Sequence, residues 1–200
     1  MTLTGTDGRE LGAKGLETRR RLLDAAEEVF AELGFYDASI VKITEAAGVA
    51  QGTFYQYFAS KQEIFEELVR DLNVRVRHAM QESASQGGDR IEQERLGFRG
   101  YFQFTSEHPA LYRIIRQAEF VSPATLQYHY EKITEGYVDG LRRAMEQGEV
   151  AKGDPEVVAW ALMAAGEMLG MRWMLWNGTR EMPPAVLLEL DRLIERMLAP

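Results

Sequence analysis

Four aromatic rings fall within the five residues from Phe54 to Phe58, directly after a segment rich in Gln, Gly and Thr. Gln can form two hydrogen bonds with the edge of adenine, while Thr and Tyr can contact phosphate oxygens or a thymine methyl group. A hydrophobic core accounts for two rings spaced four residues apart on one helical face, here Phe54 and Phe58. Tyr55 and its polar neighbours then face outward, so the stretch carries the chemistry of a surface that reads DNA.

The residues around this stretch predict two short helices joined at a glycine. Ser39 suits the N-cap of a helix with apolar residues at 40, 43, 46 and 47, and Gly48 ends that helix. A third short helix is expected from about Gln51 to Phe58. Because the residues before the glycine are small and Val49 follows it, the two helices can cross closely, as in a helix-turn-helix.

Helical spacing recurs along the rest of the chain, and no strand-like alternation persists. Further helices are expected at about 17–33, from 61 through 76, and at 89–107, 109–119, 123–147, 155–177 and 184–198. Gly34 ends the first of these, a capping box at Ser60–Glu63 opens the next, and proline marks the start of later ones. The fold class is therefore all-α, with about nine helices.

The helices divide the chain of 200 residues into three expected parts. Residues 1–15 are polar and rich in glycine, and we expect a disordered tail there. Residues 16–62 form a three-helix domain that contains the helix-turn-helix, and residues 63–200 form a larger helical body. A length of 200 residues suits one large domain or two small ones.

Composition narrows the class of protein. Hydrophobic residues make up 46% of the chain, which supports a substantial core, and the absence of cysteine excludes disulfides, thiolate metal sites and cysteine nucleophiles and fits a cytoplasmic location. The net charge of −8 lacks the basic footprint typical of nucleic-acid binders. Within Ser39–Lys61, however, Lys42 and Lys61 are opposed only by Glu45, so the local charge is compatible with phosphate contact.

Membrane and enzyme functions find little support in the sequence. The segment Val157–Trp176 is long enough to span a bilayer, but Glu167 and Arg172 lie inside it, so we expect a buried helix and no membrane partner. The chain has no G-x-S-x-G, G-x-G-x-x-G, P-loop or H-E-x-x-H motif, and its three histidines lack metal-ligand spacing. We therefore expect no enzymatic activity, no metal and no cofactor.

The stretch ASIVKITEAAGVAQGTFYQYFASKQEIFEELV resembles the DNA-binding module of the tetracycline-repressor (TetR) family of bacterial transcription regulators. Three runs carry the resemblance: Ile-x-x-Ala-Ala-Gly-Val, Gly-Thr-Phe-Tyr-x-Tyr-Phe, and Ser-Lys-x-x-Ile-Phe. It covers residues 16–75 closely, while the remaining chain resembles the family only in the number and length of its helices.

The resemblance implies which side chains meet DNA. Those expected at phosphates are Ser39, Lys42, Tyr57 and Lys61, and those expected in the major groove are Gln51, Gly52, Thr53, Tyr55 and Gln56. The sequence departs from the family pattern at Thr44 and at Val41, where a basic or polar residue often stands. We expect Lys14 and Arg19–Arg21 to compensate by reaching a phosphate or the minor groove.

Aromatic and methionine residues are concentrated after Ser83, and an ordinary helical core accounts for most of them. Ligand cavities are lined by such side chains together with a few polar groups. Glu167, a carboxylate among Trp and Met residues, suggests a polar group of this kind; the alternatives are a structural ion pair or an exposed position. The predicted lining residues are Tyr101, Phe104, Tyr112, Phe120, Tyr128, Trp160, Met163, Glu167 and Met171. The ligand would be a small hydrophobic or aromatic effector, such as a fatty-acyl chain, a bile-acid-like molecule or a drug.

The family resemblance also implies a homodimer through the helices at 155–177 and 184–198. Gly166 and Gly170 permit close backbone approach and favour a helix–helix seam on their side of the first of these helices. The apolar stripe of the last helix comprises Leu187, Leu190, Ile194 and Leu198. A twofold dimer would present two recognition helices to half-sites about 34–36 Å apart.

Together these features predict a ligand-responsive, sequence-specific DNA-binding repressor. It would act as a homodimer on a palindromic, double-stranded operator and be released by a small hydrophobic effector. The alternative is a ligand-independent DNA-binding protein or a helical protein-interaction module. A solid core between the helices at 98–137 and 160–174 would favour that alternative, and a cavity there would oppose it.

Overall fold

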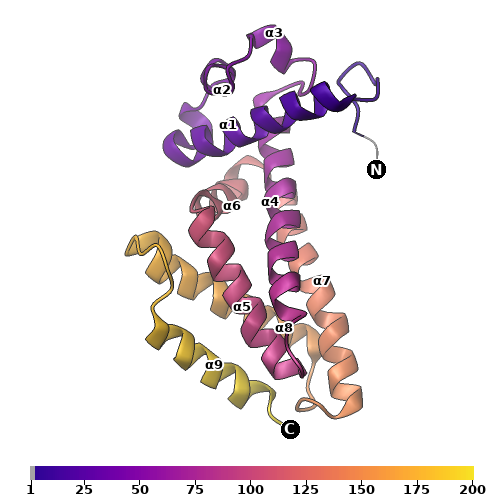
Figure 1. Ribbon diagram of the computed structural model, residues 1–200, viewed down its shortest axis with the longest axis vertical. Coiled ribbons are helices and arrows are strands. Elements are labelled where there is room, and N and C mark those ends of the chain that lie inside the picture. The colour runs from indigo at the N-terminus through magenta and orange to yellow at the C-terminus, as the bar shows by residue number, and fades with distance from the viewer. Residues whose placement is uncertain (1–2) are drawn as a thin grey trace. The chain divides into compact units, whose positions relative to one another are not determined.

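The computed structural model describes residues 3–200, which are largely helical (Figure 1). The elements are α1 (Ala13–Asp37), α2 (Ile40–Ala47), α3 (Gln51–Phe54), α4 (Lys61–Ala84), α5 (Arg90–Glu107), α6 (Ala110–Val121), α7 (Pro123–Gln147), α8 (Pro155–Gly170), the π-helix η1 (Met171–Trp176) and α9 (Pro184–Leu198). Within residues 3–200 the structure has no β-strand, and the only β-type pairing is an isolated antiparallel bridge between Thr4 and Glu10. Residues 3–200 contain nine α-helices, which confirms the all-α class and the expectation of about nine helices.

The chain forms two compact units. The first unit contains the residues up to Leu72 together with Arg113–Leu126, and the second contains Asn73–Tyr112 and Gln127–Pro200. Helices α4, α6 and α7 therefore contribute to both units. The sequence places the domain boundary at residue 62, whereas the first half of α4 belongs to the first unit because its apolar residues are buried there.

The core of the first unit is built from aromatic side chains of α1, α3 and α4. Phe30 and Phe65 are fully buried, and their rings meet edge to face with centroids 5.2 Å apart. Phe54 and Phe58 are also buried, with ring centroids 5.7 Å apart. Full burial of such a side chain contributes about 1.5–3 kcal/mol. The prediction that Phe54 and Phe58 form the core pair is confirmed.

Local sequence signals determine where the helices of this unit end. Ser39 caps α2 by accepting a hydrogen bond from the amide of Lys42 at 3.2 Å, and Gly48 ends α2 in the left-handed region with φ of 64°. Gly34 interrupts α1 with φ of 75°, as expected of a glycine at that point. Ser60 accepts from the amide of Glu63 at the start of α4. These four positions agree with the sequence analysis.

Helix α3 is shorter than expected. It ends at Phe54, and the amides of Gln56 and Tyr57 donate to carbonyls three residues back, at Thr53 and Phe54. The segment after Phe54 is thus a tight turn and not a continued α-helix. Tyr55 consequently lies on this turn at the C-terminal end of α3.

Residues 3–12 form a small loop, and the expectation of a disordered tail is corrected for them. The amide of Leu11 donates to the carbonyl of Leu3 at 2.9 Å, which closes the loop. The amide of Thr6 donates to the carbonyl of Gln56 at 2.9 Å, and its hydroxyl donates to the carbonyl of Tyr55 at 2.7 Å. Residues 13–15 of the expected tail belong to α1. Residues 1–2 lie outside the described part of the chain.

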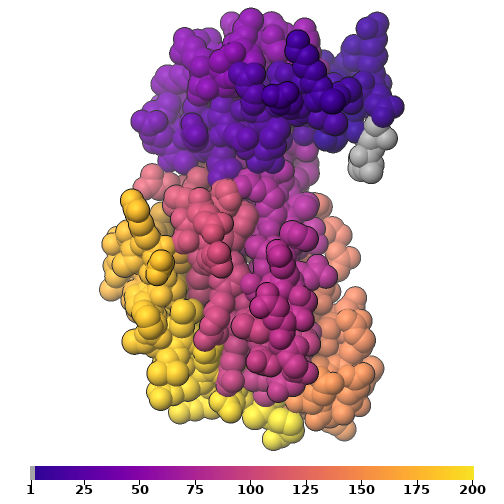
Figure 2. Space-filling view, in the orientation of Figure 1, coloured from indigo at the N-terminus to yellow at the C-terminus, as the bar shows by residue number. Residues whose placement is uncertain are grey.

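In the second unit, α9 packs along α5 (Figures 1 and 2). Arg99 forms an ion pair with Asp191 at 2.6 Å, and Arg95 forms one with Glu195 at 2.7 Å. The apolar residues of α9 complete a core shared with α5, α7 and α8; they are Leu190, Ile194 and Leu198. Most of the predicted apolar stripe of α9 is therefore buried within its own unit.

Helix α8 also belongs to the second unit, and its glycines pack against side chains of that unit. A Cβ atom at Gly166 would lie 2.5 Å from the ring of Phe98, and one at Gly170 would overlap the hydroxyl of Tyr112. The prediction that these glycines form a seam between two protomers is therefore wrong, because residues of the same chain occupy that side. The expected helix at 155–177 is regular only to Gly170 and then continues as η1. Within residues 3–200, the structure contains no helix with the length and apolarity that crossing a membrane requires.

Candidate nucleic-acid interface and effector region

The exposed surface of α3 and the following turn carries most of the predicted groove-facing residues. Gln51, Gly52 and Gln56 are exposed, and Tyr55 exposes 47% of its surface. No atom lies within 4 Å of a Cβ built at Gly52, so a ligand can approach the backbone at the start of α3 closely. Thr53 is half-buried. This surface offers amide and hydroxyl groups for hydrogen bonds and has no cation of its own.

The start of α2 supplies groups that suit a phosphate. The oxygen of the Ser39 hydroxyl accepts from the amide of Lys42, which leaves its O–H free to donate. Lys42 is exposed, and its ammonium makes only a long contact of 3.4 Å with the carbonyl of Asp37. The N-terminus of a helix also favours an anion through its unpaired N–H groups.

Lys61 is directed toward the protein in this structure. Its ammonium donates to the carbonyls of Phe35 at 2.6 Å and of Ala38 at 2.7 Å, and it lies 4.5 Å from the centre of the Phe35 ring. Partial burial lowers its pKa. A phosphate contact by Lys61 stays a prediction, and it would compete with these carbonyls. Tyr57 is half-buried, and its hydroxyl lies 3.8 Å from a Cβ built at Gly15.

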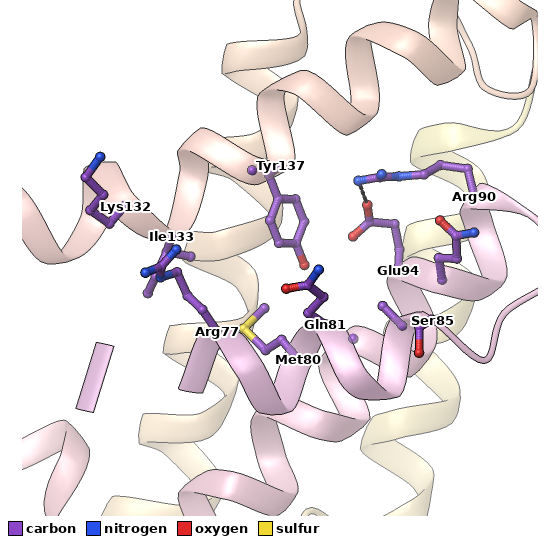
Figure 3. Close-up of a pocket in the computed structure, with 13 residues that line it drawn as sticks. Arg77, Met80, Gln81, Ser85, Arg90, Glu94, Lys132, Ile133 and Tyr137 are labelled. Carbon is purple, nitrogen blue, oxygen red and sulfur yellow. Dashed lines mark hydrogen bonds and ion pairs between the residues drawn. The ribbon is translucent and has the colours of Figure 1, made fainter. Parts of the chain in front are cut away.

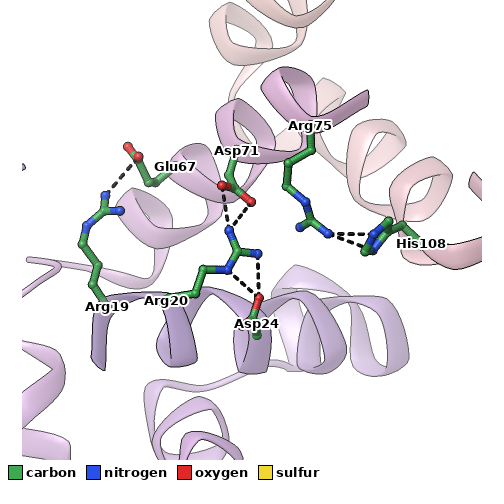
Figure 4. A network of polar contacts seen from close by, with 7 residues as sticks. All are labelled: Arg19, Arg20, Asp24, Glu67, Asp71, Arg75 and His108. Atoms are coloured by element: carbon green, nitrogen blue, oxygen red, sulfur yellow. Dashed lines mark hydrogen bonds and ion pairs between the residues drawn. The ribbon is translucent and has the colours of Figure 1, made fainter. Parts of the chain in front are cut away.

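The arginines expected to reach DNA instead join α1 to α4 (Figure 4). Arg20 forms a bidentate contact with Asp71 at 2.8 and 2.9 Å and also binds Asp24. Arg19 forms an ion pair with Glu67 at 3.0 Å. The guanidinium groups of both residues are therefore engaged inside the first unit, and the expectation that they contact DNA is corrected.

Arg21 has a similar internal role. Its guanidinium donates to the carbonyl of Ala47 at 2.5 Å, at the C-terminal end of α2. A cation at this position interacts favourably with the negative end of the helix dipole. Arg21 thus fixes α2 against α1. Lys14 is exposed, and of the four expected compensating cations it is the one whose side chain forms no ion pair or hydrogen bond within residues 3–200.

Several of the residues predicted to line an effector pocket come together in the second unit. Tyr130, which the sequence analysis missed, donates from its hydroxyl to Glu167 at 2.9 Å, and its ring lies 6.2 Å from that of Trp160. The rings of Tyr101 and Tyr112 meet edge to face at 6.2 Å. Tyr130 is one of three tyrosines on α7, and no pattern in the sequence distinguishes it from the other two. The predicted residues Met163, half-buried, and Met171, buried, lie on α8 and η1.

Buried tyrosine hydroxyls give this cluster a defined chemistry. Burial raises the pKa of Tyr112 to about 12, and burial also raises the pKa of Tyr101 well above its usual value. The Tyr112 hydroxyl is buried and has no hydrogen-bond partner within residues 3–200. Both hydroxyls are therefore protonated at neutral pH and can donate a hydrogen bond to a carbonyl or an anion.

The remaining predicted lining residues are Phe120, Phe104 and Tyr128. Phe120 exposes 74% of its surface and belongs to the first unit, so its assignment to a pocket is wrong. Phe104 packs on the ring of His108, with centroids 4.5 Å apart, and Arg75 binds the same histidine (Figure 4). Tyr128 is half-buried on α7. Helical periodicity places each residue on a face but does not show which neighbour that face meets.

A cleft of about 430 Å³ opens between α4, α5 and α7 (Figure 3). It is lined by Arg77, Met80, Gln81, Ala84, Ser85, Arg90, Gln93, Glu94, Gly97, Lys132, Ile133, Gly136 and Tyr137. None of the nine predicted lining residues is among them. Sequence analysis missed the cleft because its walls come from three helices, and the residues on each are ordinary for a helix surface.

One end of this cleft holds a buried ion pair. Glu94 exposes only 3% of its surface, and burial raises its pKa, while the paired Arg90 acts in the opposite direction. Burial also raises the pKa of Tyr137 well above its usual value, and the charge of Glu94 adds to that effect. This end is therefore polar but electrically balanced.

The first unit, with two helices crossing at Gly48 and an exposed polar surface over the Phe54–Phe58 core, defines a helix-turn-helix protein of the DNA-binding class. A family model described as "Bacterial regulatory proteins, tetR family" matches residues 22–68. An uncharacterized HTH-type transcriptional regulator YdgC of Bacillus subtilis (strain 168) is 39% identical over 106 residues, which are 51% of this chain and 54% of that protein. The match thus spans about half the length of that relative.

Two further comparisons concern a curated relative and a solved structure. A protein of Bacillus subtilis (strain 168) named "Fatty acid metabolism regulator protein" is 30% identical over 138 residues, covering 66% of this chain and 71% of that protein. The structure of the transcriptional regulator FadR from Bacillus subtilis in complex with stearoyl-CoA shares the fold, with a TM-score of 0.78 at 21% identity over 88% of this chain and 96% of that one. The chain belongs to the TetR family of transcriptional regulators.

Proposed function

We propose that this protein is a sequence-specific transcriptional repressor that binds a palindromic operator as a homodimer and leaves it when a small hydrophobic effector binds. The observation that carries the proposal is the exposed surface formed by Gln51, Tyr55 and Gln56 over the buried pair Phe54 and Phe58. This surface lies inside the segment that matches the family model. Operator binding would take place in the bacterial cytoplasm.

The proposed contacts with DNA are of two kinds. Gln51 and Gln56 would read base edges, with Thr53 and Tyr55 beside them and Gly52 allowing close approach. Ser39, Lys42, Tyr57 and Lys61 would hold phosphates, and Lys61 would have to exchange a carbonyl for a phosphate to do so. Because α3 has no cation, phosphate contacts position the protein while neutral side chains select the sequence.

The last two helices support the proposed dimer. An exposed apolar stripe runs along α8 at helical spacing and comprises Val157, Ala161, Ala164 and Met168. On α9 two exposed apolar residues four positions apart, Leu193 and Met197, share a side of the helix, while the exposed Leu188 lies on another side. Exposed apolar residues gathered on one side of a helix indicate a surface that another chain covers. The proposed partner surface is therefore the outer side of α8 and α9, and not the glycine side that the sequence analysis favoured.

The proposed effector belongs to the fatty-acyl class. Two similar proteins support this choice, one named as a regulator of fatty-acid metabolism and one solved with stearoyl-CoA. A ligand of this kind would release DNA only through a difference in its affinity for the DNA-competent and released states. That difference is the coupling between the two sites.

A ligand-independent DNA-binding protein is the second candidate, and one observation favours it. The region between the helices at 98–137 and 160–174, where the sequence analysis expects a cavity, holds a packed core that includes Phe98, Phe102 and Leu162. Within residues 3–200, a cleft lies between α4, α5 and α7, and none of the predicted lining residues belongs to it. The two candidates therefore differ in whether any acyl ligand changes operator binding.

The test is a selection of bound sequences from random duplex DNA at one near-physiological salt concentration. We expect a twofold symmetric site with arms about one turn apart. The Tyr55→Ala variant, run in parallel, should recover nothing above background. The recovered duplex would then be titrated with stearoyl-CoA, and release of DNA would separate the repressor with an effector from the ligand-independent candidate. If the unaltered protein enriches no symmetric site, the proposed function is wrong.

A further inference from the structure

The cleft between α4, α5 and α7 has an uneven distribution of charge. Three cations and one carboxylate line it. Figure 3 shows Arg77 and Lys132 toward one end and Arg90 with Glu94 toward the other, and the ring of Tyr137 between them. Because Arg90 and Glu94 neutralise each other, the excess positive charge lies at the Arg77 end.

Arg77 is held in place from behind by buried polar groups. Its Nε donates to the side-chain oxygen of Asn73 at 3.0 Å. Asn73 is fully buried, and its amide donates to the carbonyl of His129 at 2.9 Å. No carboxylate within residues 3–200 forms an ion pair with Arg77. The terminal nitrogens of Arg77 are therefore oriented, charged and without a counter-ion from the described chain.

The neighbours of Arg77 do not supply the missing negative charge. Lys132, on α7, is a second cation, and it is paired with Glu135 at 2.6 Å. His129 is buried beside Asn73, and burial together with the charge of Arg77 lowers its pKa to about 4. His129 is therefore neutral at pH 7, and the one excess charge at this end belongs to Arg77.

Apolar side chains lie between the charged groups of the cleft. Met80 and the ring of Tyr137 lie in its middle beside the amide of Gln81, and Ile133 lies next to Arg77 (Figure 3). Gly136 also lines the cleft, and a Cβ built there meets no atom within 4 Å. A volume of about 430 Å³ falls in the range of sites that hold small molecules, about 300–1,000 Å³.

We propose that this cleft binds an amphipathic organic anion, with its carboxylate or phosphate at Arg77 and its apolar body along Met80, Ile133 and Tyr137. An anionic head forms charge-assisted hydrogen bonds with the free edge of the guanidinium, whereas a cationic head is repelled and a neutral one leaves the charge unpaired. The inference rests on the proposed function only in identifying this ligand with the effector. Binding to the cleft can be tested without DNA.

The first experiment measures binding to the full-length protein by isothermal titration calorimetry. Three probes share one chain length: decanoate, decanol and decyltrimethylammonium. We expect decanoate to bind at least about ten-fold more tightly than decyltrimethylammonium, since only the anion pairs with Arg77. Equal affinity for the cation, or no binding of decanoate to the unaltered protein, would overturn the proposal.

Three variants locate the binding site. Arg77→Gln should weaken decanoate binding about ten-fold or more while leaving decanol binding unchanged. Gly136→Leu should abolish binding of both probes by filling the cleft, and a helical glycine replaced by leucine keeps the helix intact. Arg142→Gln, at an exposed arginine on α7 outside the cleft, is the matched control and should bind decanoate normally. Unchanged decanoate binding by Gly136→Leu would place the ligand elsewhere and overturn the proposal.

A second measurement separates this inference from the proposed function. The selected operator is labelled, and its release by stearoyl-CoA is followed by fluorescence anisotropy for the unaltered protein and for Gly136→Leu. Release from the unaltered protein alone supports both ideas. Release from both proteins keeps the proposed function and overturns the cleft as the effector site. If decanoate occupies the cleft but stearoyl-CoA releases no DNA, the cleft inference stands and the effector part of the proposed function fails.

Discussion

The ammonium of Lys61 lies 2.7 Å from the carbonyl oxygen of Ala38, so the first residue of α4 is bonded to the residue that precedes the cap of α2. The sequence motif suggests a phosphate ligand at this position, and the structure shows a structural hydrogen bond. Both roles use the same nitrogen. Loss of Lys61 should therefore affect stability as well as DNA binding.

We expect Lys61→Met to lower the free energy of unfolding by about 1–3 kcal/mol, because two carbonyls lose a charged donor while the apolar stem is retained. Urea denaturation measures this change, and operator affinity measured by anisotropy should fall as well. Lys14→Met, at an exposed lysine, is the control for charge alone. A variant as stable as the unaltered protein would reject the structural role of Lys61.

Tyr55→Ala should weaken operator binding at least about ten-fold while changing the free energy of unfolding little, because nearly half of this side chain is exposed. Tyr36→Ala removes another exposed tyrosine of the first unit and should leave operator affinity unchanged. Anisotropy titrations and thermal unfolding of both variants provide the comparison. Equal affinity of the two variants would contradict the assignment of Tyr55 to the interface.

Thr6 should act on DNA binding through the turn after α3. Its hydroxyl donates to the carbonyl of Tyr55 at 2.7 Å, so Thr6→Val frees that carbonyl and loosens the turn that carries Tyr55. We expect a loss of about three- to ten-fold in specific affinity, with the slope of log affinity against log salt unchanged, since no phosphate contact is lost. Thr4→Val, in the same loop, is the control. A changed salt slope would show that the loop itself contacts phosphates.

His129 should make stability depend on pH. Its pKa is lowered to about 4 in the folded protein from 6.5, so the unfolded chain binds more protons between these values. Stability therefore falls as the pH drops from about 6.5 toward 4, by roughly 3 kcal/mol at most. Denaturant unfolding at pH 7.5 and 5.0 measures the slope. The slope of the unfolding free energy against pH should be smaller in His129→Gln. It should be unchanged in the control His78→Gln, because His78 is exposed. An unchanged slope in His129→Gln would show that other groups cause the pH dependence.

The dimer should depend on the exposed side of α8. Met168→Asp places a charge on the exposed apolar stripe and should produce monomers in light scattering, because an unpaired charge is costly in an apolar interface. Gly166→Leu should instead destabilise the fold, because its side chain would collide with Phe98 of the same chain. A Met168→Asp protein that remains dimeric would move the interface to another surface.

Local chemistry alone determined much of the first unit. Ser39 and Gly48 set the ends of α2, because a capping hydroxyl and a left-handed glycine act on backbone groups within a few residues. The spacing of Phe54 and Phe58 predicted the buried pair for the same reason. The family runs fall in this segment, so the helix-turn-helix could be recognised from sequence alone.

Only the tertiary structure decided where side chains without a local partner are placed. Helix α8 is apolar on two sides, so periodicity could not show that Gly166 meets Phe98 while Met168 stays exposed. The same holds for Arg20, which pairs with Asp71 from a distant part of the chain, and for Arg77 in the cleft. These outcomes depend on which helices become neighbours, and spacing along one helix carries no information about the surface that it meets.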